Sequence, residues 1–260
     1  MMANNNSIKK TLIVAFSLCV VCSVVVSAAA VALRPVQQTN QELDRKTNIL
    51  QVAELYKPGQ SVAEQFSHIT PKVVDLNTGE YSDRFDPDTF DQFGAAEDPE
   101  LSESLKGNDP AGLGRRENFA TIYLVGDPTD PEQIIVPVRG QGLWSMMYGY
   151  LALKGDGNTI VGLSFYQQGE TPGLGGEVDN PRWKALWDGK EVYSDNGMEP
   201  VIRLVKGGVD SQTPNAENKV DALSGATLTS RGVTQLLQFW LGEQGFAKYL
   251  SRFRDPSQGA

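Results

Sequence analysis

The segment of this 260-residue chain whose residue types best suggest chemistry is Asp221–Ser230, which reads DALSGATLTS. Its centre, Ser224–Thr227, places small residues and two hydroxyls just before an amphipathic helical pattern from Val233 to Trp240. Backbone N–H groups in the first turn of a helix are unpaired, and the helix dipole favours negative charge there. Such a segment can therefore seat a phosphate. The alternative, which the local pattern alone favours, is that Ser224 or Thr227 only caps the helix.

Two further glycine-rich segments are Gly140–Gly149 (GQGLWSMMYG) and Glu170–Gly176 (ETPGLGG). Amides free of bulky side chains can hydrogen-bond the carbonyls of a flat heterocycle, and Leu174 can cover its face. Taken separately, each segment is more simply an ordinary turn or a strand with a packed tryptophan. Together with the phosphate seat, they predict a pocket for flavin mononucleotide. No Gly-x-Gly-x-x-Gly sequence occurs, which argues against a Rossmann dinucleotide site.

The composition excludes several kinds of chemistry. The only histidine is His68, and the only cysteines, Cys19 and Cys22, lie in an apolar run. The rest of the chain therefore has no cysteine nucleophile, disulfide or cysteine-ligated cluster, and a multi-histidine zinc site is excluded. The Cys-x-x-Cys spacing allows a redox pair, although two small residues in a hydrophobic helix is the simpler interpretation. A net charge of −9 argues against nucleic acid as a partner. Any reactive atoms are thus expected to come from a cofactor.

The apolar run Leu12–Leu33 is interrupted only by three serines and would span roughly 33 Å as a helix, enough to cross a membrane. A cleaved secretory signal is the alternative, with Lys9 and Lys10 before it and the small residues 27–30 as a cleavage site. The run exceeds the usual signal core, which favours an uncleaved anchor. Both interpretations place the lysines in the cytoplasm and the following chain across the membrane.

After Pro35, helical spacing predicts a helix from Thr39 to Lys57, with Thr39 as its cap, and a second helix from Val62 to Ile69. Residues 83–114 are acidic and rich in Asp-Pro turns, and the acidic spacing does not fit a calcium loop. These features predict a helical stalk followed by an irregular acidic region.

The pattern changes to β-strands from residue 116. Strands are expected at 121–125, 134–138, 142–154, 159–166 and 201–206, with turns at 127–131 and 155–157, and helices at 180–187 and 232–253. The fold class is therefore α+β, with one N-terminal transmembrane helix followed by a soluble domain of antiparallel sheet and flanking helices. The expected organisation is a cytoplasmic N-terminus (1–11), a transmembrane helix (12–33), a stalk and acidic region (34–115) and an FMN-binding domain (116–260).

Three motifs together resemble the FMN-binding domain family: Gly142–Ser145 (GLWS), Glu170–Gly175 (ETPGLG) and Asp221–Thr227 (DALSGAT). In order, spacing and surrounding sequence, essentially the whole chain is similar to the C-subunit family of the bacterial Na⁺-translocating NADH:quinone reductases. The Ser-Gly-Ala-Thr motif is highly specific, because in that family a flavin transferase reads it. Its threonine takes FMN through a phosphoester bond, and the corresponding residue here is Thr227.

The resemblance also implies roles for the neighbouring residues. Asp221 would fix the approach to the turn or assist metal-dependent transfer. The residues that would shape the turn are Ser224, Gly225 and Ala226. The candidate contacts of the flavin are Leu143, Trp144, Ser145, Glu170, Thr171, Gly173, Leu174 and Gly175. One departure is Gln168, where many relatives have a histidine; a neutral amide there would make the flavin's potential less dependent on pH.

The function implied by the resemblance is a one-electron relay. The chain would be a flavoprotein subunit, not catalytic alone, in a complex that oxidises NADH, reduces quinone and pumps sodium. Its partners would be the complex's other subunits, the flavin transferase and the bacterial inner membrane, with the domain on the periplasmic side. Two alternatives remain: the homologous flavoprotein subunit of an ion-translocating ferredoxin:NAD⁺ oxidoreductase, and a membrane-tethered binding module without redox chemistry.

Overall fold

The computed structural model describes residues 8–194 and 197–254, and the chain divides into two compact units after Lys46. Residues 1–7 of the expected cytoplasmic N-terminus lie outside the described residues. The first unit is formed by the N-terminal part of helix α1 (Ile8–Val52). An 18-residue window of this helix has a mean hydropathy of 2.7 and is not buried against the rest of the chain. By length and composition α1 can therefore cross a membrane.

Helix α1 continues through Pro35, so the prediction of a new helix beginning at Thr39 is wrong. Proline removes its own N–H donor and its ring crowds the carbonyl four residues earlier, which weakens the helix locally but leaves its other hydrogen bonds available. The Thr39 hydroxyl does not cap anything but donates to the Pro35 carbonyl oxygen at 3.1 Å, one turn earlier. The helix also ends at Val52 and not at Lys57, and Glu54 just beyond has a left-handed φ of 59°.

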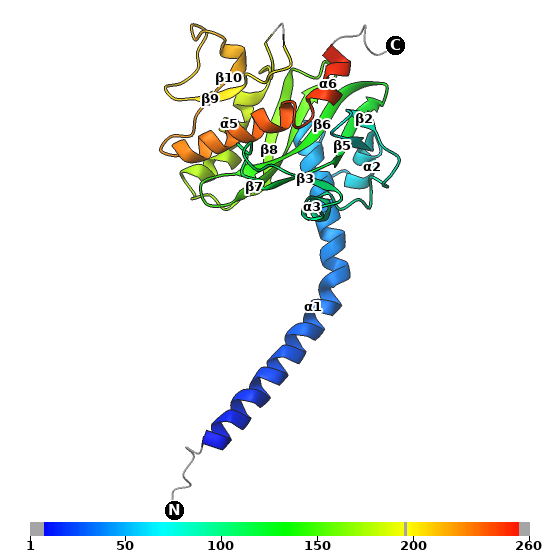
Figure 1. Ribbon diagram of the computed structural model, residues 1–260, viewed down its shortest axis with the longest axis vertical. Coiled ribbons are helices and arrows are strands. Elements are labelled where there is room, and N and C mark those ends of the chain that lie inside the picture. The colour runs from blue at the N-terminus through cyan, green and yellow to red at the C-terminus, as the bar shows by residue number, and fades with distance from the viewer. Residues whose placement is uncertain (1–7, 195–196, 255–260) are drawn as a thin grey trace, which may run out of the picture. The chain divides into compact units, whose positions relative to one another are not determined.

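The second unit, Thr47–Ala260, is built on a six-stranded sheet in the order β2-β1-β5-β6-β7-β8 (Figure 1). All neighbouring strands in this sheet are antiparallel. The strands are β1 (Ile69–Asp75), β2 (Glu80–Tyr81), β5 (Phe119–Asp127), β6 (Asp130–Gln141), β7 (Met146–Lys154) and β8 (Ile160–Gln167). The expected α+β class with an antiparallel sheet is confirmed.

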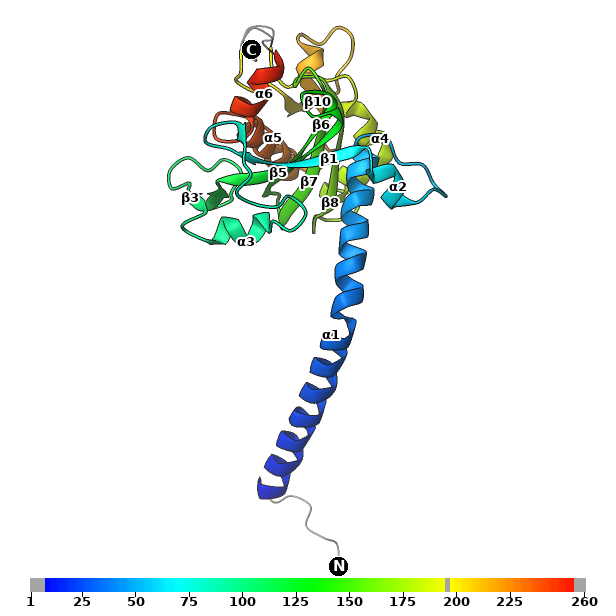
Figure 2. The same ribbon diagram turned by 90° about the vertical axis from the view of Figure 1, so that its right-hand side faces the viewer.

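Alternation along the strands gives the sheet two buried faces. On one face, residues such as Leu124, Ile134 and Leu151 form a core with α5 (Thr227–Leu241) and α6 (Ala247–Arg254). On the other face, neighbours such as Ile135 pack with the end of α1 and with α2 (Val62–Phe66). Figure 2 shows α5 and α2 on opposite faces of the sheet. Because side chains of a strand alternate between faces, each buried strand contributes to both cores.

The remaining elements are short. They are α3 (Gln92–Glu97), β3 (Ser102–Ser104), β4 (Arg115–Glu117), η1 (Gly175–Asp179), α4 (Pro181–Lys184), η2 (Ala185–Trp187), β9 (Arg203–Val205), η3 (Ala216–Asn218) and β10 (Lys219–Asp221). Strands β3 and β4 pair antiparallel, and β9 and β10 pair parallel. Strand β10 leads directly into the Ser224–Thr227 turn, so this small sheet positions the start of α5.

Three further expectations need correction. The chain is in a β-strand from Ile69, so α2 is shorter than the helix predicted over 62–69. Strands β1 and β2 belong to the main sheet, and the compact unit therefore begins well before residue 116. The helix predicted over 232–253 is two helices, which the segment 242–246 separates. The hairpins at 127–131 and 155–157 form as predicted.

Candidate functional site

Thr227 is the first residue of α5, and its side chain is exposed. The residue at the N-cap position is Ala226, and no side chain caps the helix there. Neither Ser224 nor Thr227 therefore acts as a cap, contrary to the simpler interpretation of the local sequence. The first intrahelical bond runs from the Ser230 N–H to the Ala226 carbonyl oxygen at 2.9 Å. The N–H groups of residues 227–229 precede this bond and remain available to an anion.

The turn before α5 is held from inside. Gly225 has a left-handed φ of +71°, which a residue with a side chain adopts only at a cost. The buried Ser230 hydroxyl accepts from the Leu223 N–H at 3.0 Å and donates to the Ala226 carbonyl oxygen at 3.0 Å. Ser230 thereby fixes both ends of the turn. It was not among the candidate site residues, because its burial cannot be read from the local sequence.

The three motifs meet at the side chain of Glu170, which is 5% exposed. Its carboxylate accepts from the backbone N–H groups of Trp144 at 2.9 Å, Leu143 at 3.2 Å and Ser145 at 3.3 Å. It also accepts from the Thr229 hydroxyl at 2.6 Å. One carboxylate thus joins the 143–145 turn, its own glycine-rich loop and the first turn of α5. Thr229 was not among the candidate site residues.

Two glycines make this junction possible. A Cβ added at Gly142 would lie 2.5 Å from Glu170 Oε1, and one at Gly175 would lie 2.6 Å from Thr229 Oγ1 and 2.8 Å from Glu170 Oε2. Contacts this short do not occur for real side chains, so only glycine fits without rearrangement. The glycines that suggested a ligand at the sequence level therefore also have a packing role: they make room for the carboxylate.

The Glu170 carboxyl is held in its ionised form. Burial raises its pKa, but hydrogen bonds from Thr229 and from the amides of Trp144, Leu143 and Ser145 lower it by more. The pKa consequently lies below the ordinary value for glutamate. At neutral pH the site thus contains a negative charge that neutral donors stabilise.

Apolar side chains lie exposed around the junction. The exposed fractions are 41% for Leu143, 68% for Trp144, 44% for Leu174 and 49% for Leu228. Leu174 lies beside the turn, because a Cβ at Gly225 would be 3.0 Å from Leu174 Cδ2. An anion seat next to exposed apolar side chains fits the two halves of FMN, a phosphate and a flat ring system.

The other candidate residues have structural contacts. The Ser145 hydroxyl accepts from the Gly169 N–H at 2.7 Å, and the Thr171 carbonyl oxygen accepts from the N–H groups of Leu174 and Gly176. Gly173 has a left-handed φ of +76° and open space around it. These contacts shape the loop; whether the same residues also touch a flavin stays a prediction.

Asp221 and Gln168 are both occupied by bonds within the chain. The Asp221 carboxylate accepts from the Val209 N–H at 2.6 Å, and its carbonyl oxygen accepts from Trp183 Nε1 at 2.9 Å. Asp221 is therefore placed to fix the approach to the turn. The Gln168 amide donates to Asp179 at 2.8 Å and accepts from the Glu170 N–H at 2.6 Å. Both ends of this amide thus hold the glycine-rich loop.

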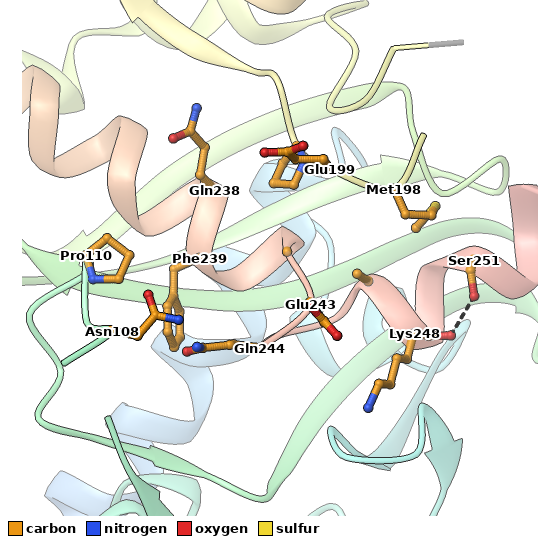
Figure 3. Close-up of a pocket in the computed structure, with 13 residues that line it drawn as sticks. Asn108, Pro110, Met198, Glu199, Gln238, Phe239, Glu243, Gln244, Lys248 and Ser251 are labelled. Carbon is orange, nitrogen blue, oxygen red and sulfur yellow. Dashed lines mark hydrogen bonds between the residues drawn. The ribbon is translucent and has the colours of Figure 1, made fainter. Parts of the chain in front are cut away.

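A cavity of about 800 Å³ lies elsewhere, at the opposite end of α5 from Thr227. Figure 3 shows side chains from α5, α6 and the acidic region around it. The exposed carboxylates of Glu199 and Glu243 line it, and its Lys248 amine donates to the Asn77 carbonyl oxygen at 2.7 Å. None of the residues of the three motifs lines this cavity, so it is not part of the candidate site.

Comparison with known proteins agrees with the geometry. The FMN-binding domain family matches residues 142–242, which include all three motifs. The C-subunit of the Na⁺-translocating NADH-quinone reductase of Pseudomonas aeruginosa is 52% identical over 97% of this chain and 98% of its own. The corresponding protein of Vibrio anguillarum is 47% identical over 98% of each chain.

Two solved structures of C-subunits resemble this chain in fold. The crystal structure of Shewanella oneidensis NqrC superposes with a TM-score of 0.74 at 36% identity, covering 83% of this chain and 99% of that one. The crystal structure of the corresponding protein from Parabacteroides distasonis has a TM-score of 0.65 at 26% identity, covering 84% and 97%. The likeness therefore extends to the fold of the whole domain.

Proposed function

Since this chain belongs to the C-subunit family of the Na⁺-translocating NADH-quinone reductases, we propose that it carries FMN covalently, through a phosphoester at Thr227. Membership of the family makes the chain an FMN-binding subunit of a sodium-translocating oxidoreductase complex, which it forms with other subunits. The alternative, a flavoprotein subunit of a ferredoxin:NAD⁺ oxidoreductase, receives no support from the names of these relatives.

The observation that carries the proposal is the position of the Thr227 hydroxyl. It is exposed on the first residue of α5, next to N–H groups that no capping side chain occupies. A phosphate bonded to this hydroxyl would lie at the positive end of the helix dipole, where its negative charge is stabilised. Gly225 and Ala226 leave the approach to the main chain open.

Covalent attachment at Thr227 requires an activated flavin donor. The threonine oxygen forms the new bond to phosphorus and loses its proton, while the bond from phosphorus to the leaving group breaks. With a flavin dinucleotide as donor, the leaving group is a nucleoside monophosphate, and no oxidant or reductant is consumed. Exposure of the hydroxyl gives a flavin transferase access to it.

Bound FMN would supply the electron-carrying chemistry, and the residues of the chain would hold it. The phosphoester fixes one end of the cofactor at α5. The exposed side chains of Leu143, Trp144 and Leu174 would cover the apolar ring. A cofactor held in this way would not be lost by dissociation while it served as an electron carrier.

We assign the anchor to the bacterial inner membrane and the FMN-binding domain to the periplasmic side. Helix α1 provides the apolar segment, and Lys9 and Lys10 precede it. Positive charges before a first transmembrane helix favour retention of that end in the cytoplasm. The flavin transferase that modifies Thr227 would then act on the periplasmic side.

Thr227→Leu tests the attachment, because leucine removes the hydroxyl and its larger side chain fits at this exposed position. After co-production with the transferase and denaturing electrophoresis, we expect no flavin fluorescence on the variant. The matched control is Thr89→Leu, which changes another exposed threonine and should retain full fluorescence. Undiminished fluorescence of Thr227→Leu would exclude Thr227 as the acceptor.

A further inference from the structure

The carboxylate of Glu170 is unusual because it is buried without a cation. Its four hydrogen bonds come from three backbone amides and one hydroxyl, all neutral groups. No ion pair among the described residues includes it. A buried charge is tolerated only when hydrogen bonds replace its lost water. Removing one of these donors should therefore lower the stability of this part of the fold.

The donors come from segments far apart in the chain. The amides belong to residues 143–145, the carboxylate follows β8, and the Thr229 hydroxyl is two residues beyond Thr227. The carboxylate contacts each of these segments, and the Ser145 hydroxyl adds a bond from the Gly169 N–H at 2.7 Å. Gly142 and Gly175 leave room for the carboxylate.

We propose that Glu170 is a positioning residue that orders the flavin seat before the cofactor is attached. By the flavin seat we mean the 143–145 turn, the glycine-rich loop 170–176 and the first turn of α5. The Glu170 carboxylate holds the 143–145 turn and the first turn of α5 in one fixed arrangement, with Thr229 as the contact on α5. The transferase then meets Thr227 in a turn that is already ordered. This inference rests on the proposed attachment at Thr227, but it concerns the unmodified chain.

A fixed arrangement of these segments should lower the KM of the transferase for the acceptor chain. If the seat is ordered only part of the time, the transferase binds a smaller competent fraction. The KM for the acceptor chain rises by the inverse of that fraction, whereas kcat is retained. Loss of a hydrogen bond to a charged group corresponds to about tenfold in such an equilibrium.

The first experiment measures hydrogen exchange on the full chain in detergent, produced without the transferase. Glu170→Gln replaces an acceptor oxygen by an amide donor that faces other donors. We expect the amides of residues 143–145 to exchange about tenfold faster. Glu100→Gln is the control, because Glu100 is exposed and its side chain makes none of these bonds. Unchanged exchange in folded Glu170→Gln would overturn the proposal.

Thr229 provides a second pair of variants in case Glu170→Gln does not fold. Thr229→Val keeps the shape and loses the hydroxyl, whereas Thr229→Ser keeps the donor. We expect faster exchange at 143–145 in the valine variant and normal exchange in the serine variant. Equal exchange in both would contradict a role for the Thr229–Glu170 bond.

The second experiment measures flavin transfer to samples with matching circular dichroism. We expect Glu170→Gln to raise the KM for the acceptor about tenfold with kcat unchanged. An unchanged KM would overturn the proposal. If the unsubstituted chain took no flavin at Thr227, the attachment would be wrong, while the exchange experiment would still decide whether Glu170 orders these segments.

Discussion

Two buried carboxylates of this protein are stabilised in opposite ways. Glu117, fully buried, pairs with the guanidinium of Arg139 and accepts from the Gln92 amide at 2.6 Å. Glu170 is 5% exposed and has neutral donors only. Glu117 joins the acidic region to the main sheet through β6, whereas Glu170 joins the segments around Thr227.

If FMN is attached at Thr227 as proposed, the difference has a physical reason. An arginine beside Glu170 would neutralise the carboxylate but would also pair with an incoming phosphate and compete with the helix N-terminus. Backbone amides and a hydroxyl satisfy the carboxylate without providing a second cation. The N–H groups at the start of α5 therefore remain the preferred place for the phosphate. At Glu117, where no ligand is expected, an ion pair has no such disadvantage.

The largest expected effect comes from breaking the ion pair. Glu117→Ala leaves the Arg139 charge buried without a partner, which typically costs about 3–5 kcal/mol. Urea denaturation should report a loss of unfolding free energy of that size. Flavin incorporation per folded molecule should not change, because Glu117 lies outside the seat. A loss below about 1 kcal/mol would show that the pair contributes little.

Crowding the Glu170 junction should have the next largest effect. Gly175→Ala places a methyl 2.6 Å from Thr229 Oγ1, so the carboxylate must shift, at a cost of about 1–3 kcal/mol. Both the unfolding free energy and the flavin incorporation should fall. Gly197→Ala is the control, because a Cβ there meets no atom closer than 3.8 Å. Normal flavin incorporation in folded Gly175→Ala would contradict the importance of this packing.

The pH dependence of stability distinguishes the charge of Glu170 from its shape. Its folded-state pKa is lowered, so its stabilising contribution is complete above the ordinary glutamate pKa of 4.5 and decreases as the pH falls below that value. The difference in unfolding free energy between the unsubstituted chain and Glu170→Gln should therefore be constant from pH 7 to about 5 and shrink towards pH 3. A difference that does not change with pH would show that the ionised form has no special role.

The smallest effect is expected at Gln168. Gln168→Ala removes the bonds to Asp179 and to the Glu170 N–H, which lie partly in solvent, and should cost about 1 kcal/mol. Denaturation measures the cost, and Glu170 should keep its other donors. A loss as large as that of Glu117→Ala would mean that the loop depends on Gln168 and not on Glu170.

The sequence predicted the turns between neighbouring strands correctly, but it did not predict strand β1. The hairpins at 127–131 and 155–157 depend on turn residues between neighbouring strands, and they form as expected. Strand β1 was missed because Ile69 pairs with Val125, far along the chain, and because Pro71 disfavours a strand. Pro71 is tolerated because β2 pairs only with Val74 and Asp75 on that side.

In the candidate site, too, contacts between distant segments could not be predicted from the sequence. The motifs predicted the three segments of the candidate site, but not that Glu170 and Thr229 would meet across the fold. The alternative of a packed tryptophan was wrong for Trp144, which is 68% exposed. Capping by Thr227 was also wrong, because Thr227 is the first helical residue and Ala226 takes the N-cap position.

The most direct test of attachment at Thr227 is a mass spectrum of the tryptic peptide 220–231, which contains Thr227 and ends at Arg231. The full chain should be produced together with its flavin transferase and exported across the membrane. We predict a peptide heavier by one FMN less one water, with fragment ions that place the addition on Thr227. An unmodified peptide, or an addition on Ser224, Thr229 or Ser230, would contradict the central claim.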